Sequence, residues 1–159
     1  MVRCGTLPLR KLAIEYGASM VYSEEIIDRK IAMCRREVNT GTGLISYTYD
    51  DPNGSKKYVP APVFVTYPNE RVVFQMGTNN GPSALVAAQI VANDVRAFDI
   101  NMGCPKHFSI QDGMGSALLC NPESSRDILS TLSRNLGEIP LTCKIRLLDT
   151  VQETVAHCR

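Results

Sequence analysis

Short apolar runs alternate with amphipathic segments along most of this chain, and this alternation limits the fold more than any other feature. The apolar runs predict strands at residues 18–22, 71–76, 97–101 and 141–145. The segments between them predict helices at residues 7–16, 23–34, 82–93, 112–119 and 122–135, with a further helix from residue 151. Ser23 is the expected N-cap of its helix, with Glu24 and Glu25 in the first turn. Buried strands that alternate with helices are typical of parallel βα units, so we expect an α/β fold.

Residues 44–67 depart from this repeat. Leu44 to Tyr49 alternates apolar and polar side chains, Asp51-Pro-Asn-Gly54 is a strong turn sequence, and β-prone residues follow as far as Tyr67. We therefore expect a β-hairpin at 44–67 that lies outside the main repeat.

A parallel sheet of this kind either stays open as a doubly wound sheet or closes into a (β/α)8 TIM barrel. Gln75, Asn101 and Lys144 stand at or near the C-terminal ends of otherwise apolar strands, where barrel enzymes build their sites. A doubly wound sheet would instead carry a glycine-rich turn after its first strand, and no such motif is present. A whole barrel needs about 250 residues. We therefore expect one domain over residues 1–159 that is roughly the N-terminal half of a barrel.

Composition narrows the class of protein. No apolar run is long enough to span a membrane, and the N-terminal segment does not resemble a signal peptide. The six cysteines contain no C-x-x-C pair and no zinc-ligand spacing, so we expect no metal site, reduced thiols and a cytoplasmic location. The net charge of +1 does not by itself indicate a nucleic-acid-binding protein.

Cys104 is the first candidate for chemistry. It follows the strand at 97–101 and lies between Gly103 and Pro105, where the glycine permits unusual backbone angles and the proline restricts its neighbour. An unperturbed cysteine is mostly a neutral thiol at pH 7 and can serve as a general acid. The alternative is a small residue in a tight turn, and spacing alone leaves both open.

Polar residues on the strands suggest a ligand cavity. Lys144 and Arg146 share one face of their strand and would suit an anionic ligand, although an edge strand with Lys144 in water is the alternative. Gln75 and Asn101 either meet the edge of a planar heterocycle or cap the turns that follow them. Asp99 is expected to solvate a strand end.

Several segments together resemble the tRNA-dihydrouridine synthase family, in particular its eukaryotic branch that modifies D-loop uridine 20. They are Arg71-Val-Val-Phe-Gln-Met-Gly77, Asp99-Ile-Asn-Met-Gly-Cys-Pro-Lys106, Gly113-Met-Gly-Ser-Ala-Leu-Leu119 and Thr142-Cys-Lys-Ile-Arg146, together with residues 1–10 and 21–25. They occur in the family's order and spacing and cover nearly the whole chain outside the hairpin region.

The resemblance implies an FMN-binding barrel that reduces the C5=C6 bond of uracil in tRNA, with NADPH as the reductant. It implies Cys104 as the proton donor. The cofactor contacts that it implies are Met1, Val2, Glu25, Gln75 and Lys144, and the substrate contacts are Asn101 and Arg146. It also leads us to expect that the chain is truncated relative to the family and that this polypeptide alone binds FMN weakly or not at all. Two alternatives stay open: a related flavin barrel acting on a free pyrimidine, and a non-catalytic fragment.

Overall fold

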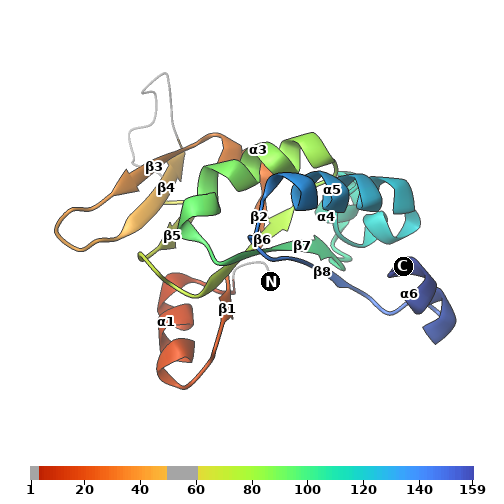
Figure 1. The fold of residues 1–159 in the computed structure, drawn as a ribbon, viewed down its shortest axis with the longest axis horizontal. Helices are drawn as coiled ribbons and strands as arrows, with labels where there is room; N and C mark the ends of the chain where they lie inside the picture. Colours follow the sequence, from red (N-terminus) through yellow and green to blue (C-terminus); the bar gives the residue numbers. More distant parts are fainter. Residues whose placement is uncertain (1–3, 50–60) are drawn as a thin grey trace.

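The central sheet is parallel and curled. The computed structural model describes residues 4–49 and 61–159. The sheet consists of β1 (Val21–Tyr22), β2 (Ile26–Ile27), β6 (Val72–Gly77), β7 (Ala97–Met102) and β8 (Leu141–Ile145). β1 and β2 both pair with β6, and β7 and β8 follow in chain order (Figure 1). The predicted partial barrel is confirmed.

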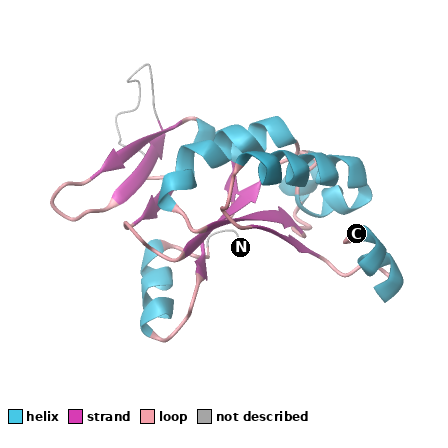
Figure 2. Ribbon diagram, viewed as in Figure 1, coloured by secondary structure: helices cyan, strands magenta, loops and turns pink. Residues whose placement is uncertain are grey.

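Helices cover the convex face of this sheet. α3 (Gly81–Val91) and α5 (Pro122–Asn135) lie side by side above β6, β7 and β8 (Figure 2). Both begin in the same way, with an asparagine side chain that caps the first turn and a proline within it. The other helical elements are α1 (Leu7–Glu15), α2 (Asp28–Ala32), η1 (Ala92–Asp94), α4 (His107–Gln111), η2 (Gly115–Cys120) and α6 (Val151–His157). Among the described residues, no helix combines the length and apolar character needed to cross a membrane.

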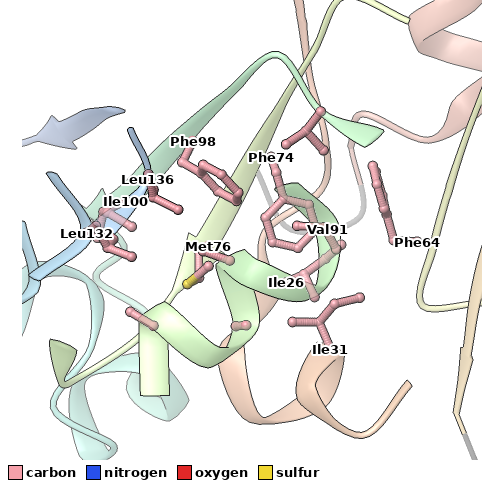
Figure 3. Close-up of a cluster of buried hydrophobic side chains, with 14 of the residues drawn as sticks. Ile26, Ile31, Phe64, Phe74, Met76, Val91, Phe98, Ile100, Leu132 and Leu136 are labelled. Carbon is pink, nitrogen blue, oxygen red and sulfur yellow. The ribbon is translucent and has the colours of Figure 1, made fainter. Parts of the chain in front are cut away.

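Strand alternation divides the sheet into an apolar face and a polar face. Phe74 of β6 and Phe98 of β7 point toward the helices, with their ring centroids 6.1 Å apart at 69°. The ring of Phe64 packs edge to face against the ring of Phe74, with their centroids 5.1 Å apart (Figure 3). Phe64 comes from a second sheet, described below, and joins that sheet to the same core. The alternate residues Gln75 and Asp99 face the concave side. The helix side therefore holds the core, and the concave side is available for a site.

A second, antiparallel sheet contains the pair of strands expected at 44–67 and adds a third strand before them. It has three strands, β3 (Cys34–Val38), β4 (Ile45–Tyr49) and β5 (Phe64–Thr66). β3 was not predicted, because most of its side chains are exposed and no apolar alternation marks it. The predicted turn at 51–54 lies outside the described residues.

Side chains from β3 and β4 fasten the second sheet to the helices. The Arg36 guanidinium donates to both carboxylate oxygens of Asp94, at 2.6 and 2.9 Å, and the Tyr47 hydroxyl donates to the same carboxylate. The hydrogen bond from Arg36 holds the pKa of Asp94 below its usual value.

The predicted helix at 23–34 is wrong in its first half. Ser23 does not cap a helix, because its hydroxyl oxygen accepts the backbone N–H of Gln75 at 2.9 Å and ties the chain to β6. β2 then pairs with the end of β6, and α2 begins only at Asp28, whose carboxylate accepts the Thr78 hydroxyl at 2.7 Å. Glu25 therefore lies above the end of β6 instead of in a helix.

The predicted helix at 112–119 is also replaced. The structure has α4 at His107–Gln111 and the 3-10 helix η2 at Gly115–Cys120. Gly113 and Gly115 separate them with φ values of 70° and 60°, which an α-helix does not accommodate. The strand expected at 18–22 is reduced to Val21–Tyr22, whereas β6, β7, β8, α1, α3, α5 and α6 lie within two residues of their expected bounds.

Candidate active site

A cavity of about 450 Å³ opens at the C-terminal ends of β6, β7 and β8. The predicted site residues in the described part of the chain all line it, although they come from four separate segments. They are Glu25, Gln75, Asn101, Cys104, Lys144 and Arg146, and the cavity adds Gly103, Pro105, Lys106 and Phe108. Met1 and Val2 lie outside the described residues. No group of His, Cys, Asp or Glu that could hold a metal ion occurs in residues 4–49 and 61–159.

Strand register places these side chains in two layers. Gln75, Asp99 and Thr142 occupy aligned positions on β6, β7 and β8 and form the deeper layer. Asn101 and Lys144 are aligned two residues further along their strands and form the layer nearer the cavity mouth. Because the strands are parallel, residues with the same offset from the strand end meet on the concave side.

Four hydrogen bonds from three residues hold the loop that carries Cys104. The Asn101 Oδ1 atom accepts the backbone N–H groups of Gly103 and Cys104, each at 3.0 Å. Arg146 Nε donates to the Gly103 carbonyl at 2.6 Å, and the Ser116 N–H donates to the Cys104 carbonyl at 2.9 Å. Asn101 thus caps its turn, which was one of the two roles the sequence left open. Contact of Asn101 and Arg146 with substrate stays a prediction.

A glycine on η2 packs directly against the same loop. A Cβ atom on Gly115 would lie 2.6 Å from the Cys104 carbonyl oxygen and 3.0 Å from Cys104 Cβ. Gly115 also has a φ of 60°, so both its conformation and its surroundings require glycine. Gly103, which the sequence suggested for unusual backbone angles, is not in the left-handed region and lies against Lys144 and Ile145 of β8.

Cys104 is a free, partly buried cysteine beside an exposed aromatic ring. Phe108 of α4 is 48% exposed and lines the cavity together with the exposed Lys106. Phe108 was not predicted as a site residue, because α4 begins five residues before the expected helix at 112–119. A partly buried thiol, cationic side chains and an aromatic face are therefore gathered at one opening.

Glu25 brings an unsatisfied carboxyl group to the cavity. Both of its oxygens are buried and find no hydrogen-bond partner among the described residues. Oε1 would lie 2.9 Å from a Cβ on Gly77, so the absence of a side chain there makes room for it. Burial raises the pKa of the Glu25 carboxyl above its usual value. A bound ligand with a hydrogen-bond donor would satisfy this group.

The expectation that Asp99 solvates a strand end is wrong. Asp99 is 3% exposed and accepts hydrogen bonds from Gln75 Nε2 and Thr142 Oγ1, each at 2.8 Å. A signal was present in the sequence, because Gln75, Asp99 and Thr142 are polar residues at matching places in three strands. Only the register shows that they meet.

Comparison with known proteins gives a match over the whole chain. The family model described as "Dihydrouridine synthase (Dus)" matches residues 1–159. The chain is 45% identical to the tRNA-dihydrouridine(20) synthase [NAD(P)+] of Saccharomyces cerevisiae, and the match covers 98% of this chain and 41% of that protein. It is 40% identical to the protein of the same name from Schizosaccharomyces pombe, over 98% of this chain and 33% of that protein. A tRNA-dihydrouridine(20a/20b) synthase of S. cerevisiae is 29% identical, over 100% of this chain and 38% of that protein. The chain thus spans between 33% and 41% of the length of these relatives.

Proposed function

Because this chain belongs to the dihydrouridine synthase family, we propose that its cavity is part of the active site of an enzyme that reduces uracil to dihydrouracil in tRNA. The observation that carries the proposal is the convergence of Glu25, Gln75, Cys104 and Lys144, from separate segments, on one cavity at the C-terminal ends of parallel strands. This is where barrel enzymes place their chemistry. Two relatives at 45% and 40% identity are named for uridine 20, which supports that position as the target.

The residues at the cavity fit a flavin. Glu25 offers a buried carboxyl that accepts no hydrogen bond from the described residues, Gln75 offers an amide, and Lys144 offers a cation. These groups suit the polar edge of a planar ring system that becomes negatively charged on reduction. We assign FMN contacts to these three side chains, with Met1 and Val2 as further expected contacts. FMN held there would supply the hydride for uracil C6 and would be reduced again by NADPH, in keeping with the NAD(P)+ in the relatives' names.

Cys104 supplies the proton in this proposal. Hydride addition at C6 leaves an electron pair at C5, and the Cys104 Sγ–H donates its proton there, so that one hydride and one proton saturate the double bond. The bonds from Asn101 and Ser116 hold the backbone of Cys104 and so limit where its sulfur can lie. The Arg146 guanidinium at the mouth suits an anionic substrate.

The substrate reaches this cavity as a flipped base, because a stacked uridine does not expose both faces of its ring. Phe108 and Lys106 at the mouth offer an aromatic face for a base and a cation for a phosphate. The named tRNA substrates of the relatives favour tRNA over a free pyrimidine. A cytoplasmic location and weak FMN binding by residues 1–159 alone stay predictions.

Replacement of the proton donor tests the proposal. Cys104→Ala in the full-length protein should abolish formation of dihydrouridine, measured by mass spectrometry of nucleosides from its tRNA substrate. Cys120→Ala is the matched control, because Cys120 is exposed and lies outside the cavity, and this variant should keep its activity. Full activity in Cys104→Ala would remove Cys104 from the mechanism. Turnover of free uracil without modification of tRNA would favour a pyrimidine reductase, and a wild-type protein inactive on both would favour a non-catalytic role.

A further inference from the structure

Asp99 is the buried centre of a row of three hydrogen-bonded side chains, which we call the ladder, beneath the cavity. It is aligned with Gln75 on one side and with Thr142 on the other. Its Oδ2 accepts Gln75 Nε2 at 2.8 Å, and its Oδ1 accepts Thr142 Oγ1 at 2.8 Å. Asp99 is 3% exposed and Gln75 is 5% exposed, so water does not compete for the bond between them, whereas Thr142 is exposed.

The chemistry of the two groups determines which way the Gln75 amide faces. A carboxylate offers only acceptors, whereas an amide has a donor end and an acceptor end. The –NH₂ end of Gln75 must therefore face Asp99, and the carbonyl oxygen Oε1 is turned away from it. An amide oxygen has two lone pairs, so a ligand can donate to Oε1 whatever other contact Gln75 makes.

A buried carboxylate is costly, and Asp99 has no ion pair within the described part of the chain. An apolar trio at these three positions would fill the space without that cost. The ladder therefore has a property that an apolar trio lacks, which is the fixed polarity of the Gln75 amide.

We propose that Asp99 is a positioning residue that fixes the Gln75 amide with its carbonyl oxygen toward the cavity. This point of the cavity then selects a planar heterocycle whose edge carries an N–H donor. An imide N–H fits this requirement, and both the flavin ring and uracil have one. The inference rests on the proposed function, because it takes the ligand of Gln75 to be one of these two rings.

Asp99→Asn tests the inference in the full-length protein. Asparagine keeps the shape but can present either end of its amide, so Gln75 is free to turn end for end. The loss of one hydrogen bond to the ligand corresponds to about a tenfold loss of affinity. Thr142→Val is the matched control, because it removes the other bond to Asp99 and leaves the Gln75–Asp99 bond in place. The dissociation constant for FMN is measured by flavin fluorescence on apoprotein, KM for tRNA is measured by dihydrouridine formation, and the thermal midpoint is measured without FMN.

The outcomes separate the two rings and the two proposals. If FMN binds Asp99→Asn tenfold more weakly and binds Thr142→Val within about twofold of its wild-type affinity, the N–H that donates to Gln75 Oε1 belongs to the flavin. If Asp99→Asn keeps its FMN affinity but has a tenfold higher KM for tRNA, this N–H belongs to uracil. Wild-type values for both quantities in Asp99→Asn, or equal losses in the two variants, overturn the inference alone. A wild-type protein that neither binds FMN nor forms dihydrouridine overturns the proposed function and this inference with it.

A second variant covers the case in which Asp99→Asn does not fold. Gln75→Glu keeps an acceptor oxygen at the cavity but removes the donor to Asp99, so the two carboxyl groups can approach only while they share a proton. FMN affinity of this variant should fall as pH rises, and the wild type should show no matching fall. The same pH dependence in both proteins would overturn the inference.

Discussion

Replacement of Gly115 by alanine should destabilise the protein through the loop that carries Cys104. Gly115 has a φ of 60°, and an alanine in this left-handed region costs about 1–2 kcal/mol. Its Cβ would also lie 2.4 Å from Ser109 Oγ and 2.6 Å from the Cys104 carbonyl oxygen. The serine can rotate, but the carbonyl belongs to the backbone and can retreat only if the loop moves, at an overpacking cost of about 1–3 kcal/mol. The free energy of unfolding should therefore fall by about 2–5 kcal/mol.

Gly137→Ala separates the two contributions. Gly137 has a φ of 61°, and a Cβ there would meet nothing within 4 Å, so this variant carries the backbone cost without the contact. Urea unfolding followed by circular dichroism measures both variants. With a denaturant slope of about 2 kcal/mol per molar urea, the midpoint of Gly115→Ala should lie about 0.5–1.5 M below that of Gly137→Ala. Equal midpoints would refute the claim that Gly115 is packed against the loop.

The same pair of variants reports on the site itself. Alkylation by iodoacetamide, mapped by peptide mass spectrometry, gives the reaction rate of Cys104 apart from the other five cysteines. Gly115→Ala should change this rate, because the Cys104 carbonyl must move, and Gly137→Ala should leave it unchanged. A change in both variants, or in neither, would contradict a local effect at Cys104.

Three further predictions follow from buried groups. Arg10→Met removes the cation that pairs with the Glu70 carboxylate, and the two side chains of this pair are 4% and 9% exposed. The free energy of unfolding, measured in urea, should therefore fall by about 3–5 kcal/mol. A double variant with Glu70→Gln should recover part of this loss, and no recovery would argue against the pair. Asn101→Ala removes the acceptor of two backbone N–H groups, and each of these hydrogen bonds contributes about 1 kcal/mol. The loop should be held less firmly, so Cys104 should be alkylated faster. An unchanged rate would show that the loop does not need these bonds. Burial raises the pKa of Glu25 above its ordinary 4.5, so the folded protein binds more protons there than the unfolded chain does. The wild type should therefore lose stability as pH rises from 4.5 through the raised pKa, and Glu25→Gln should not show this loss. Urea midpoints of the two proteins that change in parallel between about pH 4 and pH 8 would contradict this.

The strands and long helices could be predicted because their signals are local. α5 and β8 match their expected bounds, since a cap, a proline and an apolar periodicity all lie within the segments themselves. Ser23 misled the prediction because a serine before two glutamates is a helix start by local rules. Its partner is the Gln75 N–H, 52 residues away, and no local pattern shows that bond.

The residues that line the site could be predicted from the sequence, but the contacts that hold them in place could not. Strand ends and family motifs named Cys104 and Lys144, and the structure brings both to the cavity. How the Cys104 loop is fastened depends on the direction of the Arg146 side chain and on the close approach of Gly115. Both are tertiary contacts between separate segments. Asp99 was misjudged for the same reason, because its burial depends on neighbours from two other strands.

The order of the strands in the sheet has a consequence for synthesis on the ribosome. β6, β7 and β8 are neighbours in space in the same order in which they leave the ribosome. The contact between Gln75 and Asp99 can therefore form as soon as β7 has docked, before Lys144 has been translated. A nascent chain paused between β7 and β8 would already hold the Gln75–Asp99 bond and the bonds from Asn101 to the Cys104 loop, but not yet Thr142, Lys144 or Arg146.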